Sequence, residues 1–230
     1  MTCLHQFDAL RYWSLVWVVG LCAGVVSAEP EKGLPGLGIP ESFGVNIHFT
    51  RADAKELAAL QESGSRFVRM DFSWGGTERK KGEYDFSAYD GLVADMGKLG
   101  IRCLFILDYG NRLYDEGVSP HSAEAQGAFA KWAGAAAKHF AGKGVLWEIW
   151  NEPNIPQFWK PKPNAEDYSR LALATIEAVR AADANAFIMG PASSTFPWEF
   201  FETMGKNGVF ARLDAASVHP YRQQIPETAE

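Results

Sequence analysis

The sequence predicts an α/β fold, a (β/α)8 TIM barrel of which about the first six β/α units are present. Strand-like apolar runs alternate with helical patterns six times along the 230 residues. The runs are almost continuously apolar, as expected of parallel strands that helices cover. Polar residues gather directly after the runs, where barrel enzymes carry their active sites.

The expected elements follow one another in regular order. The strand candidates are Phe43–His48, Phe67–Asp71, Cys103–Asp108, Val145–Trp150, Phe187–Gly190 and Ala215–Val218. The helix candidates are Ala52–Ser63, Tyr89–Leu99, Ala123–Phe140, Asn164–Ala182 and Trp198–Gly205. Gly64, Gly100 and Gly142 follow the first three helices, where a left-handed cap is expected.

A doubly wound open sheet is the competing interpretation of this alternation. No glycine-rich phosphate turn follows the first strand, and Gly44-Val45-Asn46 lacks the G-x-G-x-x-G spacing of a dinucleotide site, so a nucleotide-binding protein is disfavoured. The polar strand ends favour the barrel. A complete barrel takes about 250 residues, so this chain is expected to be about two units short.

The N-terminal residues resemble a secretory signal. Arg11 precedes an apolar stretch, and Val26-Ser27-Ala28 fits a small-residue cleavage site. We expect a signal peptide over 1–28, a Gly- and Pro-rich linker over 29–40, and a C-terminally incomplete catalytic barrel over 41–230. An uncleaved membrane anchor is the alternative. Either implies an exported protein, periplasmic or extracellular.

The net charge, the cysteines and the histidines indicate which partners and metals the protein is expected to lack. The formal net charge of −6 disfavours a nucleic-acid partner. Of three cysteines, two lie in the signal-like segment, and Cys103 in an apolar strand is expected to be a core residue. The histidines are widely spaced without cysteine partners, so no metal is expected.

The most informative motif is Trp147-Glu148-Ile149-Trp150-Asn151-Glu152-Pro153-Asn154. It is typical of a short buried strand that stops at a carboxylate, and Pro153 prevents the strand from continuing. Alternation along a regular strand would place Glu148, Trp150 and Glu152 on one face, with Asn151 on the other face or turned by the strand's end.

This motif resembles the retaining glycosidases of clan A, and among them glycoside hydrolase family 39, in particular its bacterial exopolysaccharide endoglycosidases. Three further stretches share the likeness. They are Gly44 to Phe49, Val68 to Trp74, and Val218-His219-Pro220-Tyr221. The resemblance implies hydrolysis of O-glycosidic bonds in a polysaccharide or oligosaccharide by double displacement, without a cofactor.

The resemblance also implies residue roles. Glu152 would be the catalytic acid/base, and Asn151 would hold the sugar 2-hydroxyl. Arg69 would orient the nucleophile carboxylate, unless it forms a salt bridge inside the barrel with Glu148. His219 and Tyr221 would pack around the nucleophile and the sugar, or else be a core histidine and a rim tyrosine.

Other candidates for substrate binding follow the strand ends. His48 and Asp108 are polar side chains at two of these ends, and Asp108 could bind sugar hydroxyls. Trp74 and Trp159 follow strands and could stack on sugar rings, or could equally be loop core. Aromatic loops around the mouth favour cleavage inside a polymer chain.

The nucleophile implied by the resemblance is a Glu on a seventh strand, and this chain has no counterpart for it. After Tyr221 only a polar segment follows, in which Glu227 and Glu230 are poor candidates. The alternative function is therefore a truncated, inactive or glycan-binding remnant of such an enzyme.

Overall fold

The computed structural model describes residues 43–221, all of which belong to one compact unit. The expected signal peptide and linker lie outside the described residues. Six strands form one parallel sheet. They are β1 (Gly44–Asn46), β2 (Phe67–Ser73), β3 (Arg102–Asp108), β4 (Leu146–Ile149), β5 (Phe187–Ser194) and β6 (Ala215–His219).

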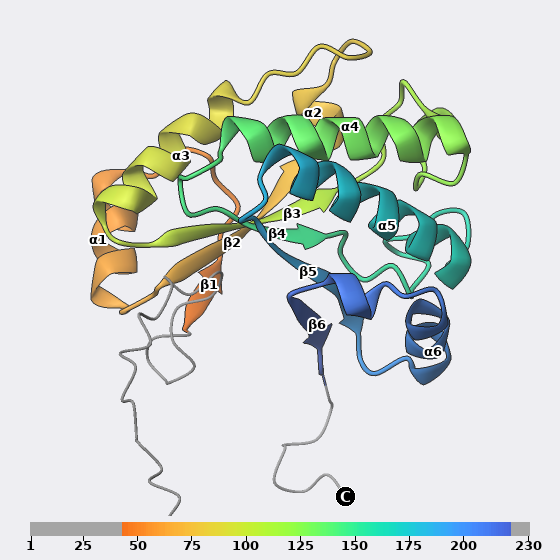
Figure 1. The fold of residues 1–230 in the computed structure, drawn as a ribbon. Helices are drawn as coiled ribbons and strands as arrows, with labels where there is room; N and C mark the ends of the chain where they lie inside the picture. The colour runs from red at the N-terminus through yellow and green to blue at the C-terminus, as the bar shows by residue number, and fades with distance from the viewer. Residues whose placement is uncertain (1–42, 222–230) are drawn as a thin grey trace, which may run out of the picture. The chain divides into compact units, whose positions relative to one another are not determined.

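Helices connect the strands (Figure 1). They are α1 (Ala54–Glu62), α2 (Trp74–Thr77), α3 (Ser87–Lys98), α4 (Ala123–His139), α5 (Ala165–Ala182) and α6 (Trp198–Lys206). Two 3-10 turns, Asp115–Gly117 and Phe210–Arg212, complete the set within the described residues. The sequence predicted all of the longer elements and missed the four-residue α2.

The strand order decides between the two predicted sheets. It runs β1-β2-β3-β4-β5-β6 without a reversal. A doubly wound sheet reverses its order at a switch point, whereas a barrel adds each strand beside the last. The sheet curls, with β1 and β6 at its edges, and α3, α4 and α5 lie across its outer side (Figure 1). The predicted first six units of a (β/α)8 barrel are confirmed.

Local signals account for the helix ends. Asp53 and Glu56 form a reciprocal capping box at α1, and the Ser122 hydroxyl accepts from the Ala125 amide at α4. Gly64 and Gly100 have φ values of +72° and +70° just after α1 and α3, as the cap prediction requires.

Glycine also permits the closest helix contact. A Cβ on Gly134 of α4 would lie 3.0 Å from the Ala178 carbonyl oxygen of α5. The absence of a side chain at Gly134 therefore lets these two helices approach each other closely over the sheet.

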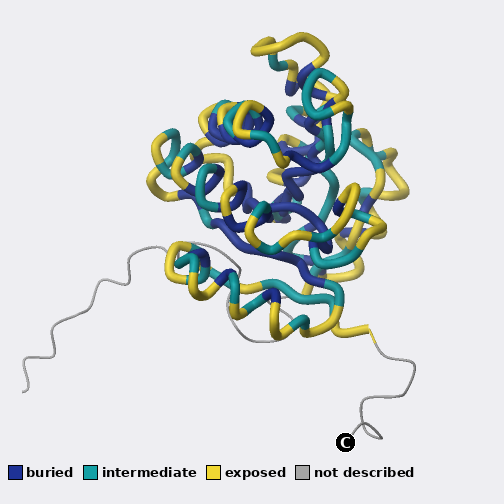
Figure 2. Tube along the Cα trace, turned by 90° about the vertical axis from the view of Figure 1, so that its right-hand side faces the viewer, coloured by how far each residue is buried: buried dark blue, intermediate teal, exposed yellow. Residues whose placement is uncertain are grey.

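The main core lies between the sheet and the helices. Phe72 of β2 is fully buried, with ring centroids 5.1 Å from Phe105 of β3, 5.6 Å from Trp132 of α4 and 5.8 Å from Trp147 of β4. Cys103 is a buried free cysteine of this core, as predicted, and burial raises the pKa of its thiol to about 12. Buried stretches lie toward the centre of the described chain (Figure 2), and β3 and β4 are almost wholly buried.

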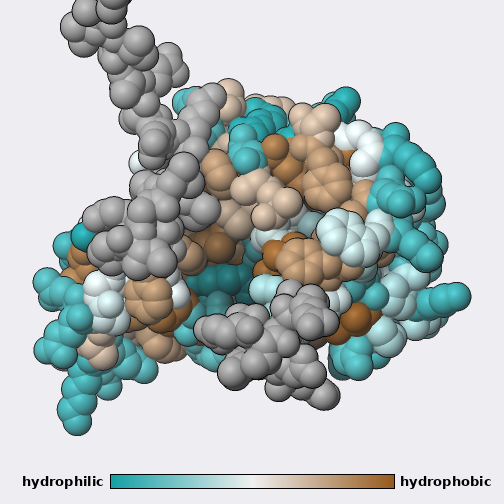
Figure 3. All heavy atoms as spheres, turned by 90° about the horizontal axis from the view of Figure 1, so that it is seen from below, coloured by the Kyte–Doolittle hydropathy of each residue, from teal (hydrophilic) through white to brown (hydrophobic). Residues whose placement is uncertain are grey.

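The concave side of the sheet is different. A small apolar layer, Leu104, Leu146 and Met189, lies at its amino-terminal end. Beyond this layer the inward side chains include the polar groups of Arg69, Glu148 and Asp108. Viewed from below, hydrophilic atoms occupy a hollow between apolar regions (Figure 3).

Candidate active site

The segment after β4 leaves regular strand geometry at once. Trp150 and Glu152 have φ values of +66° and +47°, a left-handed conformation that costs a residue with a side chain about 1–3 kcal/mol. The turn carries the Trp150 ring to the helix side, with its centroid 5.9 Å from Phe129 of α4. The prediction that Glu148, Trp150 and Glu152 share one face is therefore wrong, because the backbone is not extended there.

The same turn brings Asn151 to the side of Glu148. Arg69 of β2 connects them: its Nε donates to Glu148 Oε2 at 2.6 Å, and its Nη2 donates to Asn151 Oδ1 at 3.0 Å. The Glu148 side chain is 2% exposed and that of Arg69 is 16% exposed. Of the two roles considered for Arg69, the internal salt bridge with Glu148 is the one observed. Fixing Asn151 is an additional role.

Glu152 is held by the two strands that follow it in the sheet. Its backbone N–H donates to the Ala192 carbonyl of β5 at 3.0 Å. Its Oε1 lies 2.6 Å from Nδ1 of His219 at the end of β6, with both side chains largely buried. The order of the strands in the sheet therefore brings Glu152 and His219 together, although they are 67 residues apart in the sequence.

Asp108 lies at the end of β3 and is completely buried. Within residues 43–221, neither carboxyl oxygen has a hydrogen-bond partner. Burial, and then the neighbouring charge of Asp71, raise the pKa of Asp108 well above its usual range. Asp108 is therefore closed off below the surface, and its role in binding sugar hydroxyls stays a prediction.

The two predicted sugar-stacking tryptophans belong to the core. Trp74 is 0% exposed, lies flat against Tyr114 at 4.9 Å, and donates its indole N–H to Glu78. Trp159 is 1% exposed and meets Trp150 edge-on at 5.1 Å. Neither ring presents a face for a sugar, so the loop-core alternative holds for both.

Two predicted residues lie at the surface. His48 follows β1 and is exposed. Tyr221 is 76% exposed, and its ring centroid is 6.0 Å from that of His219. The structure thus brings together Arg69, Asn151, Glu152 and His219, with Tyr221 beside them.

The sequence prediction missed two aromatic residues after β5. Phe196 and Trp198 are 42% and 70% exposed, and they follow a strand end as the other aromatic candidates do. The same criterion would have found them, since Ser193 and Ser194 close the apolar strand just before.

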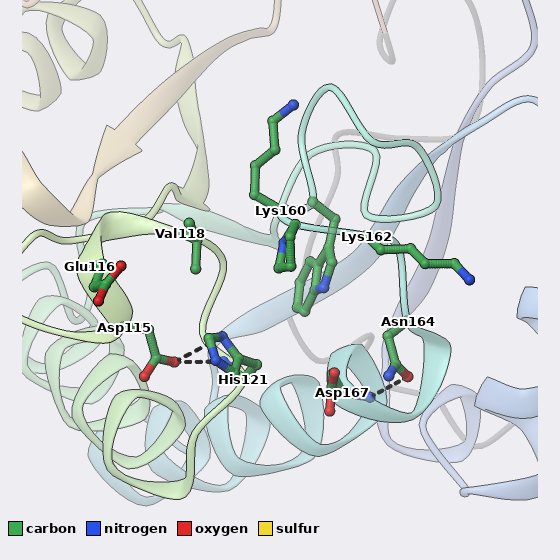
Figure 4. Close-up of a pocket in the computed structure, with 10 residues that line it drawn as sticks. Asp115, Glu116, Val118, His121, Lys160, Lys162, Asn164 and Asp167 are labelled. Atoms are coloured by element: carbon green, nitrogen blue, oxygen red, sulfur yellow. Dashed lines mark hydrogen bonds and ion pairs between the residues drawn. The ribbon is translucent and has the colours of Figure 1, made fainter.

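A cavity of about 730 Å³ lies on the loops after β3 and β4 (Figure 4). Two of its three acidic side chains are engaged. Asp115 accepts from the backbone N–H groups of His121 and Ser122, and Asp167 pairs with Arg170 inside α5. Burial raises the pKa of Asp115, but the hydrogen bonds to Ser122 and His121 together lower it below its usual value. Asp115 therefore holds the loop before α4 in place.

Two kinds of feature are absent from the described residues. Within residues 43–221, no group of three or more His, Cys, Asp or Glu side chains is placed to hold a metal ion. In the same range, no helix has the length and apolar character needed to cross a membrane.

A curled parallel sheet with a carboxylate directly after its fourth strand is the arrangement expected of a glycoside hydrolase of the barrel type. The family model for cellulases, glycosyl hydrolase family 5, matches residues 31–225. The chain belongs to this family, and the expected clan A relationship is confirmed.

The individual relatives agree with this class. A β-xylosidase of Geobacillus stearothermophilus is 33% identical over 85 residues, which are 35% of this chain and 16% of the relative. A family 39 glycoside hydrolase of Bacteroides cellulosilyticus superposes with a TM-score of 0.63 at 22% identity, over 77% of this chain and 38% of its own.

A monomeric β-xylosidase of Caulobacter crescentus gives a TM-score of 0.62 at 23% identity, over 76% of this chain and 41% of its own. At these identities the solved structures show the fold alone. The chain spans about two fifths of the length of these solved relatives, and the expected likeness to family 39 is one of fold.

Proposed function

We propose that the protein hydrolyses O-glycosidic bonds in a polysaccharide by a retaining double displacement, with Glu152 as the acid/base. The observation that carries the proposal is the placement of Glu152 after β4, fixed by Ala192 and His219. A left-handed backbone at a residue with a side chain is costly, and such strain gathers at functional sites.

The contact with His219 suits a group that gains and loses a proton. A protonated Glu152 gives its proton to the glycosidic oxygen while a nucleophile carboxylate attacks the anomeric carbon and the C–O bond breaks. The Glu152 carboxylate then takes a proton from the water that releases the sugar. His219 Nδ1 can donate to the ionised carboxylate and, in its other tautomer, accept from the protonated one.

The Asn151 side chain is held in an orientation that suits binding of the sugar 2-hydroxyl. Its carbonyl oxygen already accepts from Arg69 Nη2, which fixes the orientation of the amide. The Asn151 side chain also shares a hydrogen bond with Tyr109. Because an amide N–H₂ carries two donors, one N–H can still donate to a sugar hydroxyl. A hydrogen bond to the 2-hydroxyl strengthens in the transition state, so a fixed donor contributes to the rate.

The second carboxyl group of the retaining pair would stand about 5–5.5 Å from Glu152. Glu148 is a poor candidate, because it is buried and committed to Arg69. We therefore assign the nucleophile to the seventh strand that the resemblance implies. The names of the relatives, cellulase and β-xylosidase, favour a neutral plant-type or bacterial glycan as substrate. Export to the periplasm or cell surface, inferred from 1–28, would place the enzyme beside such polymers.

The decisive experiment uses a form of the protein that includes the seventh strand with its nucleophile, and compares it with its Glu152→Gln variant on an aryl glycoside panel and on a purified exopolysaccharide. Loss of general acid–base catalysis should lower kcat about 10²–10⁴-fold. Glu202→Gln is the matched control, because Glu202 is a 70% exposed carboxylate on α6. Equal activity of the Glu152→Gln and Glu202→Gln variants would reject the assignment.

The retaining mechanism has its own test. In Glu152→Ala, a dinitrophenyl glycoside should still form the glycosyl–enzyme, because its leaving group needs little acid assistance. The glycosyl–enzyme should then accumulate, because no general base activates the attacking water. Azide needs no general base and should restore turnover, giving a glycosyl azide of retained configuration. An azide product of inverted configuration, read by NMR, would contradict double displacement.

A further inference from the structure

The loop between β5 and α6 carries an exposed aromatic pair. The Phe196 and Trp198 rings are 6.0 Å apart at an interplanar angle of 19°, and Phe201 meets Trp198 edge-on at 6.1 Å. Trp198 is 70% exposed. Single exposed apolar residues are ordinary, but contiguous exposed rings mark a binding surface. We call Phe196 and Trp198 the aromatic platform.

A cavity of about 620 Å³ adjoins the platform. Trp198, Pro197 and Phe200 give it apolar walls. Asn154, Glu199 and Thr203 add amide, carboxylate and hydroxyl groups. This volume lies within the range of small-molecule sites. The mixture suits a ligand with a flat C–H face and a hydroxyl-bearing edge, which is the surface of a pyranose ring.

Asn154 connects this cavity to the catalytic loop. It lies two residues after Glu152, and its side chain makes two hydrogen bonds to the backbone of Ser194, both of 2.9 Å. These bonds fix the loop after β4 to the end of β5. The wall of the cavity is therefore continuous with the segment that holds the acid/base.

We propose that the aromatic platform and this cavity form a distal sugar subsite that holds a residue of the polysaccharide away from the bond being cleaved. The ligand class is a β-linked polymer of pyranoses with equatorial hydroxyls, whose rings present flat C–H faces to Trp198. This inference deepens the proposed function and rests on it. A sugar ring on Trp198 removes exposed aromatic surface from water, and the Asn154 and Glu199 side chains can bind its hydroxyls.

The subsite explains why a polymer would be a better substrate than a short glycoside. A small aryl glycoside reaches Glu152 without touching the platform, whereas a longer chain touches both. The platform therefore contributes to the binding of oligosaccharides and has no role in bond cleavage itself.

The test measures binding of cellopentaose and xylopentaose to the full chain by calorimetry. Trp198→Ala should weaken binding of at least one of them about tenfold, as expected for the loss of one aromatic contact of about 1.4 kcal/mol. Phe43→Ala is the matched control, because Phe43 is a 45% exposed ring at the start of β1, and it should leave the affinity unchanged. Trp198→Phe should retain most of the binding.

The outcomes separate the two proposals. Glu152→Gln should keep the oligosaccharide affinity while losing turnover. Full turnover in Glu152→Gln together with weak binding in Trp198→Ala would reject the acid/base assignment and leave the subsite standing. No binding by the wild-type chain, or equal binding by Trp198→Ala, would overturn the subsite. A dimer of the wild-type chain that Trp198→Ala dissociates, with sugar affinity unchanged, would also overturn it, because the platform would then be an interface between copies.

Discussion

The two faces of the sheet carry different kinds of side chain. On the convex face, Phe72, Phe105 and Trp147 belong to the apolar core that packs against α4 and the other helices. On the concave face, the same strands present Arg69 and Glu148, and Asp108 closes the end of β3. Alternation along each strand allows this division, since successive side chains point to opposite faces. One face supplies stability, and the other supplies the charges of the site.

Truncating the convex core should have the largest effect. Phe72→Ala removes a fully buried ring with six aromatic neighbours, and we expect the free energy of unfolding to fall by about 5 kcal/mol, the upper end for such a change. Urea unfolding measures it. A loss near 1 kcal/mol would show that the core relaxes around the gap.

Breaking the ion pair on the concave face should cost somewhat less. Arg69→Met leaves the buried Glu148 carboxylate without its partner, and we expect a loss of about 3 kcal/mol. The double variant Arg69→Met with Glu148→Gln should recover much of this loss, because no uncompensated charge then remains buried. Additive losses in this cycle would show that the two side chains are not coupled.

The buried carboxyl of Asp108 should make stability depend on pH. Its folded-state pKa is raised, by burial first and then by Asp71, so its contribution is fully present below about pH 4 and is lost as the pH rises through the folded-state pKa. Asp108→Asn should therefore gain stability over the wild type as the pH rises from about 4, with the gap levelling off once Asp108 is ionised. A gap that does not change with pH would contradict this.

The smallest effects should lie outside both faces. Ser122→Ala removes the hydroxyl that caps α4 and should cost about 1 kcal/mol. Trp198→Ala removes an exposed ring and should change stability by less than about 0.5 kcal/mol. Thermal or urea unfolding measures the change in the free energy of unfolding for both variants. A large loss of stability in Trp198→Ala would show that the ring has a structural role.

Most of the fold could be predicted from local patterns. The apolar runs and helical periodicities located each strand and longer helix to within a few residues, because burial between helices dictates apolar strands. Two ends differ. The predicted fourth strand stops one residue early, at Ile149, where the left-handed turn begins, and β5 continues past Gly190 across a bulge to Ser194.

The sequence by itself determined the barrel class, the position of Glu152 at the end of the fourth strand, and Cys103 as a core residue. Tertiary structure decided what each side chain touches. It buried Trp74 and Trp159, joined Glu152 to His219, and left Trp198 at the surface. The physical reason is the distance along the sequence over which each signal acts. Periodicity within one helix or strand shows which of its faces is apolar. The exposure and the hydrogen-bond partners of a side chain depend on residues far away in the sequence that the sheet brings close. The positive φ at Trp150 reverses the face that alternation would assign, and only the folded chain reveals it.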